Sequence, residues 1–177
     1  MKKIILTLML LFLMGCSLSN TPTKKVEAFF KKYQTLDKDV LTDLDSVLST
    51  KLNFNENQKE EYRNIMKKHY QNLVYEIKDE KLDGDEAIVT VEITVTDFNK
   101  VFDETSEYLI SHPDEFNDEN GNYDISKYID YQINKLKETK AKTKYTLDIP
   151  LTMINDEWTV NKLDNDTLNK INGIYNY

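Results

Sequence analysis

The stretch AIVTVEITVT, residues 87–96, alternates apolar and polar side chains from one end to the other. Successive side chains of a strand point to opposite faces, so the apolar set shares one face. That set is Ala87, Val89, Val91, Ile93 and Val95, and Ile88, Thr90, Glu92, Thr94 and Thr96 form the opposite face. The alternation and the β-branched composition predict a long strand of an antiparallel sheet that buries one face.

Partners for this strand are found on both sides of it in the sequence. Residues 73–78 alternate in the same way, and Asp83-Gly84 between the two runs is a strong hairpin signal. Further along, residues 145–153 alternate and residues 157–163 return after Asn155-Asp156, with Trp158 and Val160 on one face. Pro150 indicates an edge or a bulge at that point. The sequence thus predicts two hairpins.

Helical periodicity fills the rest of the chain. Apolar residues recur at helical spacing from Pro22 to Tyr33, from Asp37 to Leu48, from Asn55 to Leu73, from Phe98 to His112 and from Asp124 to Lys140. The second of these helices is expected to point Val40, Leu41, Leu44, Val47 and Leu48 inward. Residues 114–123 are expected to form an acidic loop, and the tail after Asp164 a short helix.

The order of elements predicts the fold class. Three helices precede the first hairpin, and two more stand between the hairpins. Helices and strands segregated in this way form an α+β fold. We expect helices packed on one face of a curved antiparallel sheet of about four strands, cone-like, with a two-helix insertion between the hairpins.

The N-terminus reads as an export signal. Lys2 and Lys3 precede an apolar run, Ile4 to Met14, that is too short to cross a bilayer, which takes roughly 20 residues, but suits a secretory signal. The run ends in Leu13-Met14-Gly15-Cys16, which resembles the lipobox of bacterial lipoproteins. This resemblance implies that Cys16, the only cysteine, is lipidated and becomes the first residue of a protein anchored on the extracytoplasmic face of the cell membrane. The alternative is an uncleaved N-terminal anchor, or a buried strand in which Cys16 is incidental.

The predicted organisation is a signal peptide at residues 1–15, a lipidated tether at residues 16–25 and a single domain at residues 26–177. Lys2 and Lys3 are two of the 23 basic residues, so 21 remain against 31 acidic ones, a net charge of −10. A domain with that charge repels nucleic acid, and we expect no nucleic-acid partner.

Three segments resemble a known family. They are Thr21-Pro22, the helix pattern Val26-Glu27-x-Phe29-Phe30-x-x-Tyr33, and the closing Asn155-Asp156-Glu157-Trp158-Thr159-Val160. The pattern resembles small lipoproteins with a nuclear transport factor two-like, cystatin-type fold. That resemblance implies a cone-shaped sheet with a pocket against the helices. We place around this pocket Tyr70, Val91, Ile93, Phe102, Leu147 and Trp158.

Metal and cofactor chemistry has little support in the sequence. His69 lies in an apolar helical stripe, where a packed core histidine is the better interpretation, and His112 lies at a helix end. The acidic run Asp114, Glu115, Asp118, Glu119 lacks the ligand order of a calcium-binding loop, so a solvated loop is favoured over a calcium site. We expect no metal and no cofactor.

Catalysis has little support either. The inward strand positions contain no ionisable acid, and Asp79 and Asp97 continue that face only at strand ends. Neither a serine–histidine–aspartate nor a cysteine–histidine set is visible. The many aromatic residues are expected to fill the core; the alternative is that some tyrosines line a ligand groove.

These observations favour a membrane-anchored, non-catalytic binding or interaction module. Its partner is another envelope protein, a second copy through the polar sheet face, or a small ligand. For the rows of threonines on that face, including Thr146 and Thr152, exposure to solvent is a simpler explanation than a contact with a second copy. An isomerase- or cyclase-like enzyme that uses the cone pocket is the alternative.

Overall fold

The computed structural model describes residues 20–175. The predicted signal peptide and Cys16 lie outside the described residues. The elements, in chain order, are α2 (Pro22–Thr35), α3 (Lys38–Ser49), α4 (Glu56–Gln71), β1 (Val74–Asp83), β2 (Glu86–Thr96), α5 (Phe98–Ser111), the 3-10 helix η2 (Pro113–Phe116), α6 (Ile125–Glu138), β3 (Lys142–Ile154), β4 (Glu157–Val160) and α7 (Asn165–Ile171).

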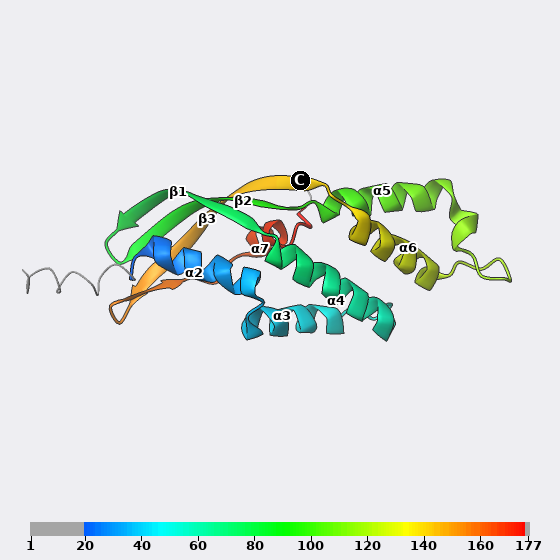
Figure 1. Cartoon of the computed structure of the whole chain (residues 1–177), viewed down its shortest axis with the longest axis horizontal. Helices are drawn as coiled ribbons and strands as arrows, with labels where there is room; N and C mark the ends of the chain where they lie inside the picture. Colours follow the sequence, from blue (N-terminus) through cyan, green and yellow to red (C-terminus); the bar gives the residue numbers. More distant parts are fainter. Residues whose placement is uncertain (1–19, 176–177) are drawn as a thin grey trace, which may run out of the picture.

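The four strands form one antiparallel sheet in the order β1-β2-β3-β4. The sheet is curved and does not close on itself, and helices cover its inner face (Figure 1). The α+β fold class expected from the sequence is therefore confirmed. Strand β2 lies in the interior of the sheet, and its inward side chains are almost fully buried: Ala87, Val89, Val91, Ile93 and Val95.

Both predicted turns have the backbone that a tight hairpin needs. Gly84 has a φ of 60°, and Asn155 and Asp156 have φ values of 51° and 62°. Positive φ at two consecutive residues matches the twist of the flanking strands, and Asn and Asp tolerate it better than most residues. Pro150 lies next to the Leu151–Val160 pair at which β4 ends, so its missing N–H costs no ladder hydrogen bond to β4.

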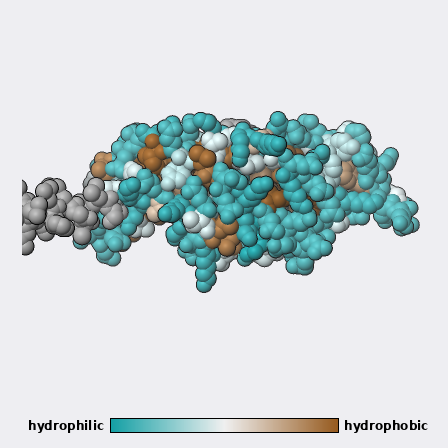
Figure 2. Space-filling view, in the orientation of Figure 1, coloured by the Kyte–Doolittle hydropathy of each residue, from teal (hydrophilic) through white to brown (hydrophobic). Residues whose placement is uncertain are grey.

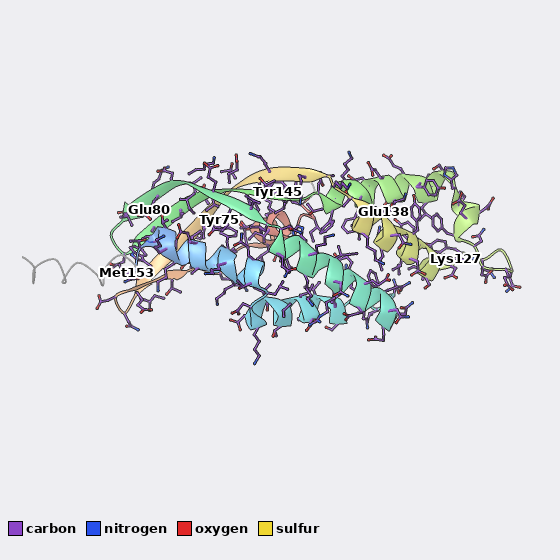
Figure 3. The ribbon with its side chains drawn as sticks, viewed as in Figure 1. Tyr75, Glu80, Lys127, Glu138, Tyr145 and Met153 are labelled. Atoms are coloured by element: carbon purple, nitrogen blue, oxygen red, sulfur yellow. The ribbon has the colours of Figure 1, made fainter. Side chains whose placement is uncertain are left out.

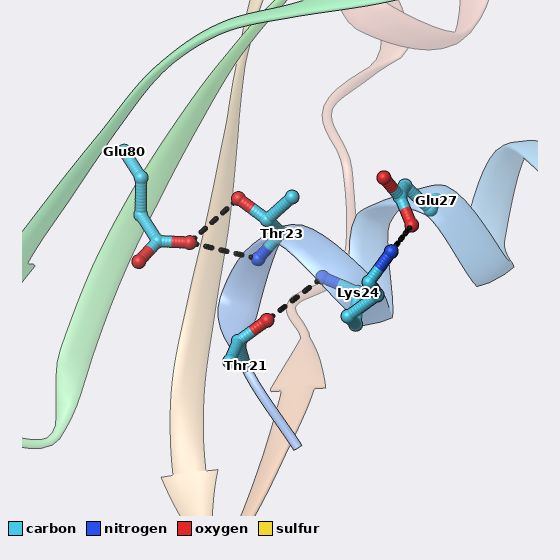
Figure 4. Close-up of polar contacts among 5 residues, drawn as sticks. All are labelled: Thr21, Thr23, Lys24, Glu27 and Glu80. Carbon is cyan, nitrogen blue, oxygen red and sulfur yellow. Dashed lines mark hydrogen bonds and ion pairs between the residues drawn. The ribbon is translucent and has the colours of Figure 1, made fainter. Parts of the chain in front are cut away.

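Helix α2 closes the inner face of the sheet. Val26 and Phe30 are fully buried against the strands, in one core with Leu73, Leu163 and Ile171. The start of the helix is fixed by Glu80 of β1, whose Oε2 accepts hydrogen bonds from Thr23 N at 2.9 Å and Thr23 Oγ1 at 2.6 Å (Figure 4). A carboxylate at a helix N-terminus also interacts favourably with the helix dipole.

A second core lies among the helices. It joins α3, α4, α5 and α6 through Leu44, Met66, Val101 and Ile133, among others. Helices α5 and α6 form the insertion and extend away from the sheet (Figure 1). The chain leaves the sheet at Thr96 and re-enters it at Lys142, which is the register partner of Thr96, so the insertion does not interrupt the ladder.

Gln58 connects helices α4 and α6. It is 2% exposed, and its Oε1 accepts from Asn55 N to complete the capping box of α4. Its Nε2 reaches α6, 3.0 Å from Ser126 Oγ and 2.7 Å from Asp130 Oδ1. One buried amide therefore serves both a helix cap and a helix–helix contact.

We expect Gln58→Ala to lower the free energy of unfolding by about 2 kcal/mol, because it leaves several polar groups without partners. Urea unfolding measures this, and Gln71→Ala, at an exposed position near the end of the same helix, is the matched control. A loss for Gln58→Ala no larger than that of the control would contradict this role.

Three expectations need correction. Val47 is 52% exposed, because the buried stripe of α3 is Val40, Leu44 and Leu48 and Val47 falls at its margin. The expected loop contains the 3-10 helix Pro113–Phe116, followed by a bridge between Asn117 and Tyr123. The tether boundary at Lys25 is too late, since Pro22–Lys25 is helical and Asn20 already bonds to the β3–β4 hairpin.

Candidate functional site

A cleft of about 570 Å³ lies where the ends of α4 and α6 meet the β2–β3 junction. Helix α6 runs from Lys127 at its distal end back to Glu138 beside the sheet, so its C-terminus faces this junction (Figure 3). Pockets that bind small molecules generally have volumes of roughly 300–1,000 Å³. The lining residues are Glu61, Asn64, Ile65, Lys68, His69, Asn72, Thr96, Phe98, Leu136, Lys137, Thr139, Lys140 and Lys142.

Local sequence fixes the walls of the cleft. Helix α4 ends at Asn72, whose N–H donates to the Lys68 carbonyl at 3.2 Å and whose side-chain Nδ2 donates to the same carbonyl at 2.8 Å. Helix α6 ends at Thr139, whose backbone turns to extended geometry, and β3 begins three residues later at Lys142. Ile65, Phe98 and Leu136 are buried and give the cleft an apolar floor.

The cleft is basic in an acidic protein. Four of its lining residues are lysines and one is a glutamate. Lys137 Nζ pairs with Glu61 Oε1 at 2.9 Å. Lys142 Nζ donates to Thr96 Oγ1 at 3.1 Å, and across residues 20–175 neither Lys68, Lys140 nor Lys142 has a carboxylate within 4.0 Å. Three cations are therefore left without a counter-ion.

His69 forms part of the wall but not a reactive group. It is 3% exposed, and its Nε2 lies 2.8 Å from the Ile171 carbonyl oxygen, so Nε2 carries the proton. Burial lowers its pKa to about 4, the hydrogen bond to Ile171 opposes the shift, and Lys142 adds to it. Its Nδ1 is shielded from solvent and has no hydrogen-bond partner among the described residues. A general base must reach the proton it removes, and this nitrogen does not.

The six residues expected around a cone pocket lie in two separate clusters. Val91, Ile93, Leu147 and Trp158 belong to the core under the sheet. Tyr70 belongs to the core among the helices, where its hydroxyl donates to Asn172 Oδ1 at 2.9 Å, and Phe102 packs half-buried against that second core.

Tyr70 also lines a groove of about 210 Å³ between α3, α4 and α7, together with Val47 and Leu168. The sequence-predicted pocket residues are thus packing residues of the two cores, with the exception of this contribution from Tyr70.

Two carboxylates of the acidic segment accept hydrogen bonds from nearby protein groups. Asp118 Oδ1 accepts from Asn120 N and Asn122 N, both at 2.8 Å, and these bonds hold the pKa of Asp118 below its usual value. Glu115 accepts from the Tyr108 hydroxyl at 2.9 Å. Within the described part of the chain, no group of three or more His, Cys, Asp or Glu side chains is arranged to hold a metal ion.

Several polar side chains of the outer sheet face bond to one another. Thr90 Oγ1 donates to Asp148 Oδ1 at 2.7 Å, and Glu92 pairs with Lys144 at 2.8 Å and with Lys78 at 3.8 Å. On the side of the molecule that Figure 2 shows, the surface is largely hydrophilic and apolar side chains form separate patches.

Comparisons with protein-family models, with curated proteins and with solved structures found no match. None of the helices within residues 20–175 is long and apolar enough to span a membrane.

The lysine cleft was not anticipated from the sequence. Its cations come from two segments that are far apart in the chain: Lys68 lies on α4, and Lys137, Lys140 and Lys142 lie where α6 ends and β3 begins. A spacing signal was available only for Lys140 and Lys142, which flank the end of the predicted helix 124–140, and alternate lysines at such a position are common on solvated surfaces.

Proposed function

We propose that this protein is a lipid-anchored extracytoplasmic module that binds a ligand in the lysine cleft without transforming it. The observation that carries the proposal is the cleft itself, which combines an apolar floor, three cations without counter-ions and a histidine whose free nitrogen is shielded. Binding sites of this kind pair an apolar surface with a few placed polar groups.

The enzyme alternative finds no comparable support. The concave face of the described sheet contains apolar side chains where an isomerase- or cyclase-like site needs a buried acid. Asp97 is occupied as the cap of α5, accepting from Lys100 N at 3.0 Å, and Asp79 is exposed at the bulge of β1. The likeness to nuclear transport factor two-like lipoproteins remains a prediction.

Anchoring at Cys16 would place the molecule in a defined way. Asn20 Nδ2 donates to the Asp156 carbonyl at 2.7 Å, and Asn20 Oδ1 accepts from Trp158 N at 3.2 Å. Residues 17–19 alone separate Asn20 from Cys16, and even a fully extended chain covers at most about 14 Å over that distance. The β3–β4 hairpin would therefore lie next to the membrane.

We expect Cys16→Ala to move the protein from the membrane fraction to the soluble fraction, or to leave it unprocessed, because two acyl chains are what hold it at the membrane. Cell fractionation with a clickable palmitate analogue measures this, with Ser17→Ala as the control. Normal membrane retention and normal labelling of the Cys16→Ala protein would rule out lipidation at this position.

A further inference from the structure

We infer that the lysine cleft takes an amphipathic organic anion, with a phosphate or carboxylate head between Lys68, Lys140 and Lys142 and an apolar part on the floor formed by Ile65, Phe98 and Leu136. This inference rests on the proposed function, since it names the ligand class of the same cleft. Each part of it follows from a separate feature of the cleft.

Charge is the first feature. Another cavity of the described structure is rich in carboxylates: it is lined by Asp97, Asp103, Glu104 and Glu107, with Lys100 as its lone cation. The lysine cleft has the opposite balance, in a chain whose net charge is −8. Like charges gathered in one cleft repel each other, and an anion between them removes that cost.

Helix dipoles explain part of this charge but not all of it. A lysine in the last turn of a helix interacts favourably with the dipole, and Lys68 of α4 and Lys137 of α6 are in such positions. Lys137 is in addition paired with Glu61. Lys140 and Lys142 lie beyond the end of α6, so neither the dipole nor an ion pair accounts for them.

The floor is the second feature. Ile65, Phe98 and Leu136 are 8%, 2% and 3% exposed, and they line the cleft beside the lysine side chains. Only a small part of this surface is exposed, and a purely inorganic anion would leave that part in contact with water. An anion with a short apolar body covers it and gains from its burial.

The distance of the cleft from the proposed membrane anchor indicates where its ligand comes from. Strand β3 runs from Lys142 at the cleft to Ile154 at the hairpin that Asn20 contacts, and its 13 residues span about 40 Å at roughly 3.3 Å each. An anchor at Cys16 would hold the hairpin end near the bilayer, with the cleft some 40 Å along the molecule. This favours a soluble amphipathic anion over the headgroup of a membrane lipid.

The test is calorimetric titration of the full lipidated protein in phosphatidylcholine nanodiscs with hexyl phosphate, inorganic phosphate and hexanol. We expect hexyl phosphate to bind more tightly than inorganic phosphate by roughly five-fold or more, because only it covers the floor. Hexanol, without a charge, should not bind measurably. Equal binding of hexanol and hexyl phosphate would overturn the role of the lysines, and equal binding of the two phosphates would overturn the role of the floor.

Matched variants separate the cleft from overall charge. The cleft variant combines Lys68→Gln, Lys140→Gln and Lys142→Gln, and the control combines Lys31→Gln, Lys38→Gln and Lys162→Gln, three exposed lysines outside the cleft. We expect the cleft variant to bind hexyl phosphate about ten-fold more weakly or worse, and the control to change by less than about three-fold. Equal losses would overturn the site, and circular dichroism confirms that both variants are folded.

Two further readings locate the source and separate the proposals. Nanodiscs that contain phosphatidylglycerol should leave hexyl phosphate binding intact; loss of that binding would mean that lipid headgroups occupy the cleft instead of a soluble ligand. If fractionation shows that the protein is not anchored but it still binds hexyl phosphate, only the proposed membrane location is wrong. If the protein is anchored but binds no anion, only the inferred ligand class is wrong.

Discussion

Replacing Gly173 by alanine is expected to lower the free energy of unfolding by about 3 kcal/mol or more. Gly173 has a φ of 69°, which costs a residue with a side chain roughly 1–2 kcal/mol. A Cβ at this position would lie 2.1 Å from the Thr96 carbonyl oxygen, a backbone atom that cannot move aside cheaply. Overpacking of that kind adds a further 1–3 kcal/mol or so.

Gly173 also joins the C-terminal segment to the cleft. Its carbonyl accepts hydrogen bonds from Phe98 N at 2.9 Å and Asn99 N at 3.1 Å, which satisfies the start of α5. Thr96, Phe98 and His69, which all line the cleft, surround this residue. Displacing Gly173 should therefore weaken ligand binding as well as stability.

Gly84 provides the matched control. Its φ of 60° is similar, but a Cβ there would meet nothing within 4 Å. Gly84→Ala should therefore cost about 1 kcal/mol, the backbone part alone. Urea unfolding of both variants gives the comparison, and a Gly173→Ala loss equal to that of Gly84→Ala would show that the close approach to Thr96 does not exist.

Acid should destabilise the protein through His69 before most carboxylates titrate. The pKa of this histidine is lowered to about 4 by burial, from an ordinary value of 6.5. Because the pKa of His69 is lower in the folded protein, the unfolded chain binds more protons at this side chain. The contribution of neutral His69 to the free energy of unfolding is therefore fully present above pH 6.5 and falls as the pH is lowered toward 4. The expected loss between pH 7 and pH 5 is about 2 kcal/mol.

Urea unfolding at a series of pH values measures this loss. The His69→Gln protein should be less stable at pH 7 but should lose much less between pH 7 and pH 5, because its buried side chain does not titrate. His112→Gln, at the exposed position of the other histidine, is the matched control. A wild-type protein of constant stability over this range would contradict the buried, neutral state of His69.

The sheet could be predicted from the sequence because its signals are local. Alternation over residues 87–96 places five side chains on one face whatever the partner strands are, and the structure buries all five. Asp83-Gly84 and Asn155-Asp156 identify the turns because few other residues tolerate their backbone angles. Val47 was misplaced because periodicity alone does not fix the edge of a helical stripe.

The cleft could not be predicted because it exists only in three dimensions. Lys68 and Lys142 line one cleft because α4 packs against α6, which leads into β3, and no spacing in the chain indicates this arrangement. The packing of Gly173 against Thr96 and His69 is likewise a long-range contact. His69 was correctly expected in the core, because its neighbours in the helix are apolar, but its place in the cleft wall was not.

Backbone amide NMR shifts of the protein during titration with hexyl phosphate test the central claim most directly. We expect the largest shifts around the cleft, at Lys68, Asn72, Thr139 and Lys142. The concave face of the sheet, sampled at Val91, Leu147 and Trp158, should stay unchanged because its core is packed shut. Shifts confined to those three residues, with none in the cleft, would contradict the account and return the site to a cone pocket.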